Sequence, residues 1–192
     1  TATTVNFAGA STATNIGANS GTLTLKNPTV VGDSSATTVN LWNTVATTVN
    51  FAGASTSTTI GATTGTISLR GMTSVNQVQE TLVTKASATG VVTHDFSTGA
   101  IFFHSSIAAN FTANFTNMPT TGDKAYAITL VLNQGGTGYY PSAVQVNGSA
   151  ATLRWANNTA PTPGTNSINT VQFTLIYTGA AWYVTAQFTK FA

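Results

Sequence analysis

The segment ATTVNFAGAST occupies Ala2–Thr12 and recurs at Ala46–Thr56. The similarity extends further, because 18 of the 25 positions of Ala2–Lys26 are identical in Ala46–Arg70 when the two stretches are compared residue by residue. A shorter copy, ATTVNLW, lies between them at Ala36–Trp42. Repeats of this kind are typical of elongated arrays and have to be recognised before any other fold is considered. They predict a shaft in the N-terminal third of the chain.

Within the repeats, apolar and polar side chains alternate over short runs that are separated by glycines. This alternation predicts half-buried β-strands. We expect their apolar members to form the core along the axis of the shaft: Val5, Phe7, Leu23, Leu25, Val49, Phe51, Ile67 and Leu69. Each strand offers only one or two such side chains, and small units are marginally stable even with larger apolar residues. The shaft therefore needs further rungs or further chains to bury its core.

Two architectures meet that need, a β-solenoid of one chain or three chains wound around a common axis. The second copy begins 44 residues after the first (Ala2 to Ala46), whereas the shorter copy begins after 34 (Ala2 to Ala36). A solenoid with constant rungs would show one regular period. The unequal offsets favour an intertwined trimeric β-helical or β-prism shaft over residues 1–71. The expected partners are therefore two identical chains.

The composition excludes several classes of function. Only 5% of the 192 residues are charged, against about 25% in typical globular domains. The six basic residues are scattered, whereas nucleic-acid binders cluster them on one face, so no nucleic-acid partner is expected. The chain has no cysteine, which excludes disulfides and cysteine metal sites. No apolar run reaches the roughly 18 residues of a membrane span, so membrane insertion is not expected.

Residues 72–89 form a transition between two kinds of sequence. Val75, Val78 and Leu82 have the spacing of one heptad, which allows a short trimeric neck. The stretch Thr81–Thr84 is equally strand-like, and we favour a strand that enters the next domain.

Residues 90–192 are rich in aromatic side chains and predict a second domain. Turn signals such as Asn147–Gly148 separate its strand-like runs: Val91–Phe96, Ile101–His104, Asn110–Phe115, Tyr126–Asn133, Ala143–Val146, Thr152–Trp155, Val171–Thr178 and Trp182–Phe188. About eight strands in ~100 residues, with no helical pattern, are typical of a β-sandwich. The whole chain is thus predicted to be all-β, with an antiparallel, jelly-roll-like β-sandwich head at its C-terminus.

Several motifs of this head occur together in a known group of proteins. They are GVVTHDF (Gly90–Phe96), AANFTANF (Ala108–Phe115), LVLNQGGTGYYPSAVQVNG (Leu130–Gly148), LRWANNTAPTPG (Leu153–Gly164) and QFTKFA (Gln187–Ala192). Over roughly Gln79 to Ala192 the chain resembles structural proteins of marine cyanophages, especially tail-fibre and fibre-like proteins. The NFAGAST repeats resemble the shaft repeats that precede this module.

The resemblance implies a parallel homotrimer on the outside of a virion, attached upstream to other virion proteins, with the head as a distal tip. Since the chain begins inside a repeat, we expect it to be the C-terminal part of a longer fibre. The head then either contacts a host-surface polysaccharide or only caps the folding of the shaft. Two alternatives remain open: a purely structural fibre on the capsid or baseplate, and a tail spike that cleaves glycans. Fold analogy cannot decide among them.

The sequence contains no catalytic signature, and no enzymatic activity or cofactor is expected. Its four acids, Asp33, Glu80, Asp95 and Asp123, are far apart in the chain, which gives no local support for the paired carboxylates of a glycosidase. A trimer could still bring equivalent acids together. The two histidines, His94 and His104, flank a predicted hairpin at Ser97–Gly99. A three-residue loop would pair them on one face, and a two-residue loop would place them on opposite faces. They are weak metal candidates, and no metal site is expected.

Aromatic and amide side chains are the binding candidates. Tyr139 and Tyr140 follow a glycine-rich loop, and Trp155 precedes a polar loop that contains Asn157 and Asn158. An aromatic face surrounded by amides suits a sugar. The competing interpretation places Trp155 and one tyrosine in the core or in a trimer interface, where aromatic residues contribute strongly. Trp182 and Tyr183, inside a predicted strand, are expected in the core or an interface.

Overall fold

The computed structural model describes Ile60, Ile67, Leu69 and residues 71–191, and it divides the chain into two units, Thr1–Leu69 and Arg70–Ala192. Six of the eight predicted shaft-core residues lie outside the described residues: Val5, Phe7, Leu23, Leu25, Val49 and Phe51. The other two, Ile67 and Leu69, are exposed in this single chain.

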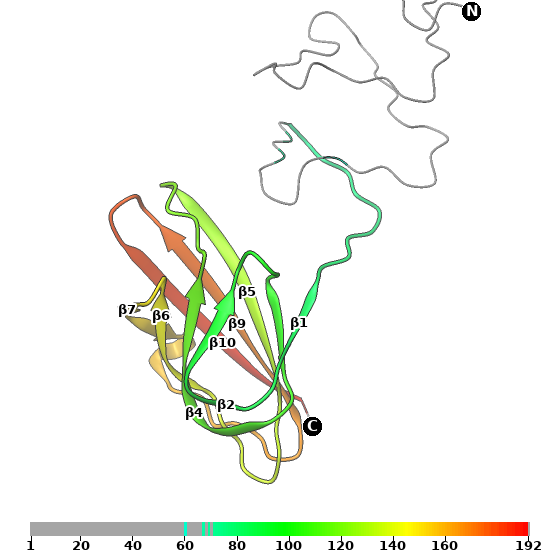
Figure 1. Ribbon diagram of the computed structural model, residues 1–192, viewed down its shortest axis with the longest axis vertical. Coiled ribbons are helices and arrows are strands. Elements are labelled where there is room, and N and C mark those ends of the chain that lie inside the picture. The colour runs from blue at the N-terminus through cyan, green and yellow to red at the C-terminus, as the bar shows by residue number, and fades with distance from the viewer. Residues whose placement is uncertain (1–59, 61–66, 68, 70, 192) are drawn as a thin grey trace, which may run out of the picture. The chain divides into compact units, whose positions relative to one another are not determined.

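The second unit is built from ten β-strands (Figure 1). They are β1 (Leu82–Lys85), β2 (Ala88–Asp95), β3 (Ile101–His104), β4 (Ile107–Thr116), β5 (Lys124–Asn133), β6 (Pro141–Val146), β7 (Ser149–Ala151), β8 (Leu153–Trp155), β9 (Ile168–Tyr177) and β10 (Trp182–Phe191). A single 3-10 turn, η1 (Ala156–Asn158), follows β8. The all-β prediction is confirmed for this unit, and each of the eight predicted runs overlaps a strand. Within the described part of the chain, no helix is long and apolar enough to cross a membrane.

The strands form two mixed sheets, a six-stranded one in the order β1-β3-β5-β9-β10-β8 and a four-stranded one in the order β2-β4-β6-β7. The prediction of antiparallel pairing is wrong for five of the eight strand pairs. β1–β3, β3–β5, β2–β4, β4–β6 and β8–β10 are parallel. The alternation of apolar and polar residues shows which side chains of a strand face the core. It does not show whether the next strand along the chain pairs with that strand in the same sheet or lies opposite it in the other sheet.

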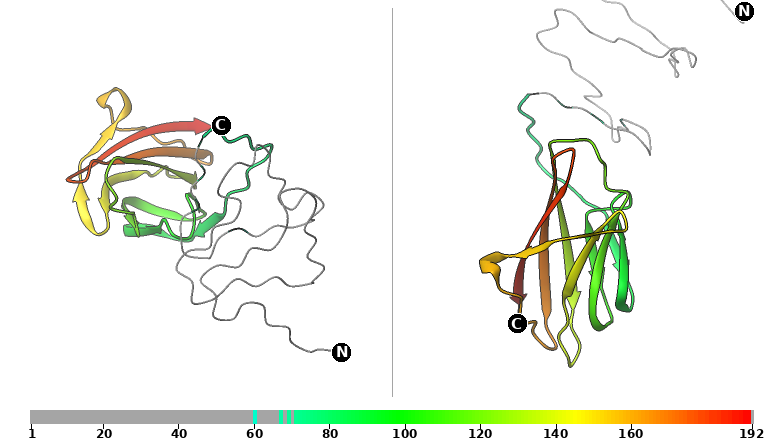
Figure 2. Two further views of the ribbon diagram at one scale, coloured as in Figure 1. Left: turned by 90° about the horizontal axis from the view of Figure 1, so that it is seen from above. Right: turned by 90° about the vertical axis from the view of Figure 1, so that its left-hand side faces the viewer.

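The parallel pairs arise because the first six strands coil. Odd-numbered strands β1, β3 and β5 lie in one sheet and even-numbered strands β2, β4 and β6 in the other, so every connection between consecutive strands crosses from sheet to sheet (Figure 2). The short arches after β1 and β3 stack on each other. The Ser105 amide donates to the Lys85 carbonyl at 3.1 Å, and the Ala88 amide donates to the Ser106 carbonyl at 3.0 Å. These hydrogen bonds continue the pairing of neighbouring strands through the two arches.

The last four strands break the coil and close the fold. β6 and β7 form a hairpin whose turn, Asn147–Gly148, has positive φ at both residues (49° and 81°), which is the geometry that favours Asn-Gly in two-residue hairpins. β8 then joins the six-stranded sheet at the outer edge of β10. β9 pairs antiparallel with both β5 and β10 over ten residues each. The long strands therefore form the rigid centre of this sheet.

Side chains from both sheets form one buried core. Phe111 and Phe115 of β4, Phe102 of β3 and Phe173 of β9 are all buried in it, and the rings of Phe115 and Phe173 lie edge to face at 5.0 Å. Aliphatic residues of β5 and β9 fill the space between them: Ile128, Leu130, Leu132, Val171 and Leu175. The two sheets pack as layers because each sheet covers the apolar face of the other.

The transition segment has an irregular path before β1. Val75, Val78 and Leu82 are all exposed, at 59%, 74% and 56%, and residues 71–81 contain no regular element. β1 begins at Leu82, as the strand interpretation of this segment expects. The first two strands therefore begin within residues 72–89, ahead of the expected boundary at residue 90.

Candidate functional site

A groove crosses the outer side of the six-stranded sheet beside β8. It consists of two adjoining hollows of about 460 and about 320 Å³, which share Trp155, Ala156 and Gln187 as lining residues. We call this the Trp155 groove. The larger hollow lies between β10 and the loop after η1 and includes Asn157 and Phe188. Its position follows from β8, which has only three residues, so that β10 extends beyond it and leaves room for the loop.

The wall of the groove is shaped by asparagines with left-handed backbone conformations. Asn157 and Asn158 have φ of 58° and 53°, a region that asparagine tolerates better than most residues. The Thr159 amide donates to the Ala156 carbonyl at 3.4 Å, and the Thr159 hydroxyl donates to the Asn157 carbonyl at 3.1 Å. Asn157 lines the larger hollow, whereas Asn158 lines neither hollow. Both residues thus have a structural role in the turn, and Asn157 has in addition a position from which it can bind.

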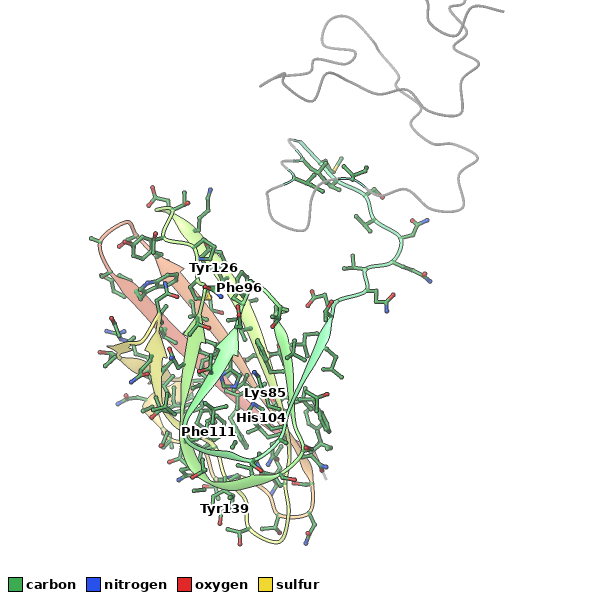
Figure 3. The ribbon with its side chains drawn as sticks, viewed as in Figure 1. Lys85, Phe96, His104, Phe111, Tyr126 and Tyr139 are labelled. Atoms are coloured by element: carbon green, nitrogen blue, oxygen red, sulfur yellow. The ribbon has the colours of Figure 1, made fainter. Side chains whose placement is uncertain are left out.

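Two of the predicted aromatic residues contact each other, and one of them, Trp155, lines the groove. The half-buried rings of Tyr140 and Trp155 lie edge to face, with their centroids 6.0 Å apart. Trp155 packs against the core and also lines both hollows, so the core interpretation and the binding interpretation are both compatible with its position. Tyr140 lines neither hollow, and neither does Tyr139, which Figure 3 places near one end of the unit. Its backbone is held by the buried Gln134, whose side-chain amide accepts from the Tyr139 amide at 3.0 Å and donates to its carbonyl at 2.6 Å.

The smaller hollow brings together polar residues that the sequence analysis did not select. Gln172 and Thr174 of β9 lie opposite Gln187 and Thr185 of β10, and all four line this hollow together with Arg154 of β8. Their signal in the sequence is the alternation of polar with apolar residues along β9 and β10, which marks one exposed face. That alternation did not reveal which strand would lie beside them, because β8 joins β10 from a distant part of the chain.

The two histidines meet in the core rather than on the surface. His94 of β2 and His104 of β3 are both fully buried, and their Nε2 atoms are 3.0 Å apart. The rings of Phe102, Phe111 and Phe115 surround His94, and Phe111 stacks on His104 at 5.3 Å. β2 and β3 belong to different sheets. The predicted hairpin is therefore wrong, since Ser97–Gly99 belongs to an arch, and the histidines bond across the core.

Burial keeps both imidazoles neutral. Burial first, and then the neighbouring His104 and Lys85, lower the pKa of His94 to about 3. Burial, followed by the charge of Lys85, lowers the pKa of His104 to about 4. Figure 3 shows Lys85 beside His104, and its ammonium lies 5.9 Å from the centre of the Phe102 ring. An uncompensated charge in such a site would be costly.

One Nε2 of the pair carries the proton of this hydrogen bond and the other accepts it. The backbone of Val92 and of Asn114 opposes the lowered pKa of His94. The described residues contain no cluster of three or more metal-ligating side chains, and the Nδ1 atoms of both histidines have no hydrogen-bond partner.

Asp95 stabilises the arch that follows β2. Its carboxylate accepts from the Ser97 amide at 2.9 Å, from the Ser97 hydroxyl at 2.7 Å and from the side chain of Asn117 at 2.9 Å. The hydrogen bonds from the Ser97 hydroxyl, from the Asn117 side chain and from the Ser97 amide, in that order of importance, lower the pKa of the Asp95 carboxyl. A carboxylate held ionised in this way is suited to fixing a turn and poorly suited to donating a proton as a general acid.

No protein-family model, curated protein or solved structure matches this chain. The proposals that follow therefore depend on the repeats, on the two-sheet unit and on the Trp155 groove.

Proposed function

We propose that the protein is a homotrimeric structural fibre of a phage virion, with an intertwined β-structured shaft and a β-sandwich head that binds a host-surface glycan. The observation that carries the adhesive part is the Trp155 groove, which combines an aromatic ring with amide and hydroxyl side chains. No reaction forms part of the proposal.

Two features support a fibre. The repeats are thin in apolar residues, so that three chains together would supply the core that one chain lacks. The C-terminal unit is different, because its core is buried within one chain and is shared by two sheets. In a projecting fibre of this kind, the shaft depends on neighbouring chains for its core. The C-terminal unit folds around a core of its own.

The chemistry of the groove favours a sugar as the ligand. The lining of the larger hollow includes Trp155, Asn157 and Gln187 and no charged residue. An aromatic ring can cover the apolar face of a sugar, and amide groups can both donate to and accept from its hydroxyls. The groove is open and lies on the exposed side of the sheet, which suits a chain of sugars rather than a small enclosed ligand.

Adsorption of the purified full chain to host cells tests this function. Asn157→Gly keeps the left-handed turn but removes the amide, and Gln187→Ala shortens an exposed side chain of the groove. Both should weaken binding at least several-fold, and Trp155→Ala should weaken it most. Tyr139→Ala, outside the groove, is the matched aromatic control and should bind normally. Unchanged adsorption of all three groove variants, each shown to be folded, would contradict the proposed site.

A further inference from the structure

The smaller hollow of the Trp155 groove differs from the larger one in a single chemical respect. It contains Arg154, the one charged residue among those that line either hollow. No acidic side chain lines the groove. The remaining residues around Arg154 are mostly hydroxyls and amides from β9 and β10: Gln172, Thr174, Thr185 and Gln187. A cation is thus placed among neutral hydrogen-bonding groups.

The position of Arg154 is fixed by the fold. Its backbone lies in β8 opposite Thr185 of β10, and its guanidinium lies 5.8 Å from the centre of the Tyr183 ring. At an exposed site such a contact is weak, and it does not use the hydrogen-bond donors of the guanidinium. Arg154 is exposed, so its donors are accessible to a ligand.

We propose that the Arg154 end of the groove is an anion subsite that selects acidic sugars, with the guanidinium binding a carboxylate or sulfate group of the glycan. A planar guanidinium matches the oxygens of such groups with two parallel hydrogen bonds. The neighbouring threonine and glutamine side chains bind the hydroxyls of the same sugar, and Trp155 lies between this subsite and the neutral hollow. This inference rests on the proposed glycan binding and specifies its substrate class.

The test uses the labelled full chain on an array that carries neutral, uronate-containing and sulfated oligosaccharides, including uronates and their neutral methyl esters. The wild type should bind acidic glycans more strongly than their neutral counterparts, with a preference that shrinks as salt is added. Uronates and sulfated glycans are tested separately, so that the result identifies whether the subsite binds a carboxylate or a sulfate group. Arg154→Gln should lose about ten-fold or more on acidic glycans and little on neutral ones.

The control is Lys124→Gln, which removes the same charge from an exposed residue at the start of β5, away from the groove lining. It should leave the preference unchanged. If Arg154→Gln retains the wild-type profile, or if Lys124→Gln loses the preference equally, the subsite is overturned.

The two proposals can fail separately. Binding of neutral glycans alone, sensitive to Gln187→Ala, would overturn the anion subsite and leave glycan binding in place. A wild-type chain that binds no glycan on the array, although it adsorbs to host cells, would overturn both the glycan assignment and the subsite.

Discussion

At the scale of single residues, the core contains a polar pair of histidines, which the sequence offers only as weak metal candidates. His94 and His104 occupy inward positions of their strands and bond to each other at 3.0 Å. Aromatic rings surround His94, the ring of Phe111 stacks on His104, and both Nδ1 atoms lack a hydrogen-bond partner. Such a pair is tolerated while it is neutral and becomes unfavourable once it is charged, because the core offers no acidic partner.

This arrangement predicts a stability that depends on pH. Unfolded histidines titrate near pH 6.5, whereas the pKa values in the folded chain are about 3 for His94 and about 4 for His104. Between pH 6.5 and 4 the unfolded chain therefore binds protons that the folded chain does not. The free energy of unfolding should fall with falling pH by about 1.4 kcal/mol per unit for each histidine, and the decline should end near pH 3.

Urea unfolding between pH 4.5 and 7.5 measures this dependence, in a range above the ordinary titration of Asp95 at about pH 4. The double variant His94→Leu/His104→Leu should show a nearly flat profile over the same range, whatever its absolute stability. A wild-type profile that is equally flat would show that the histidines are not buried as described.

At the scale of elements, the sequence located the strands but not their partners. The run Val91–Phe96 overlaps β2 and the run Ile101–His104 coincides with β3, because alternation and turn residues are local signals. The sequence predicts a hairpin at the five-residue connection between β2 and β3. The connection is an arch. Whether a connection forms a hairpin or an arch depends on which faces of the two strands pack together, and no local sequence pattern specifies this.

Loops at the Tyr139 end of the fold pack closely, and glycines make this possible. A Cβ at Gly138 would overlap the carbonyl oxygen of Gly164 and would lie 3.0 Å from Pro163 Cβ. Gly164 itself is buried next to Ser167 and Lys190. By contrast, a Cβ at Gly136, in the same loop as Gly138, would meet nothing within 4 Å.

These two glycines provide a matched pair of substitutions. Gly138→Ala should destabilise the unit by about 1–3 kcal/mol, the usual cost of overpacking. Gly136→Ala should change the free energy of unfolding by less than about 0.5 kcal/mol, as exposed substitutions do. Chemical denaturation of both variants measures the difference. Equal effects at the two positions would show that the loops do not approach each other as closely as described.

At the scale of the whole molecule, the two parts of the chain are expected to have different requirements. The strands and buried core described here all lie between residues 82 and 191. The repeats, by composition, are expected to need neighbouring chains. Assembly should therefore depend on the repeats and folding of the head should not.

Light scattering on the full chain and on a fragment of residues 71–192 tests this division. The full chain should have about three times its 19.6 kDa chain mass, whereas the fragment should be a monomer that still unfolds cooperatively. A monomeric full chain would contradict the trimeric shaft. A trimeric fragment would place the assembly interface in the head instead.

The sequence by itself determined the all-β character, the positions of most strands and the Asn147–Gly148 turn, because these follow from alternation and local backbone preferences. It also pointed to Trp155 and Asn157, which the fold brings to one groove, and to Tyr140, whose ring contacts Trp155. Only the tertiary structure decided the parallel coil, the buried histidine pair and the presence of Arg154, Gln172 and Gln187 in that groove. Each of these depends on contacts between segments far apart in the chain, and such contacts are set by how whole faces pack rather than by any local pattern.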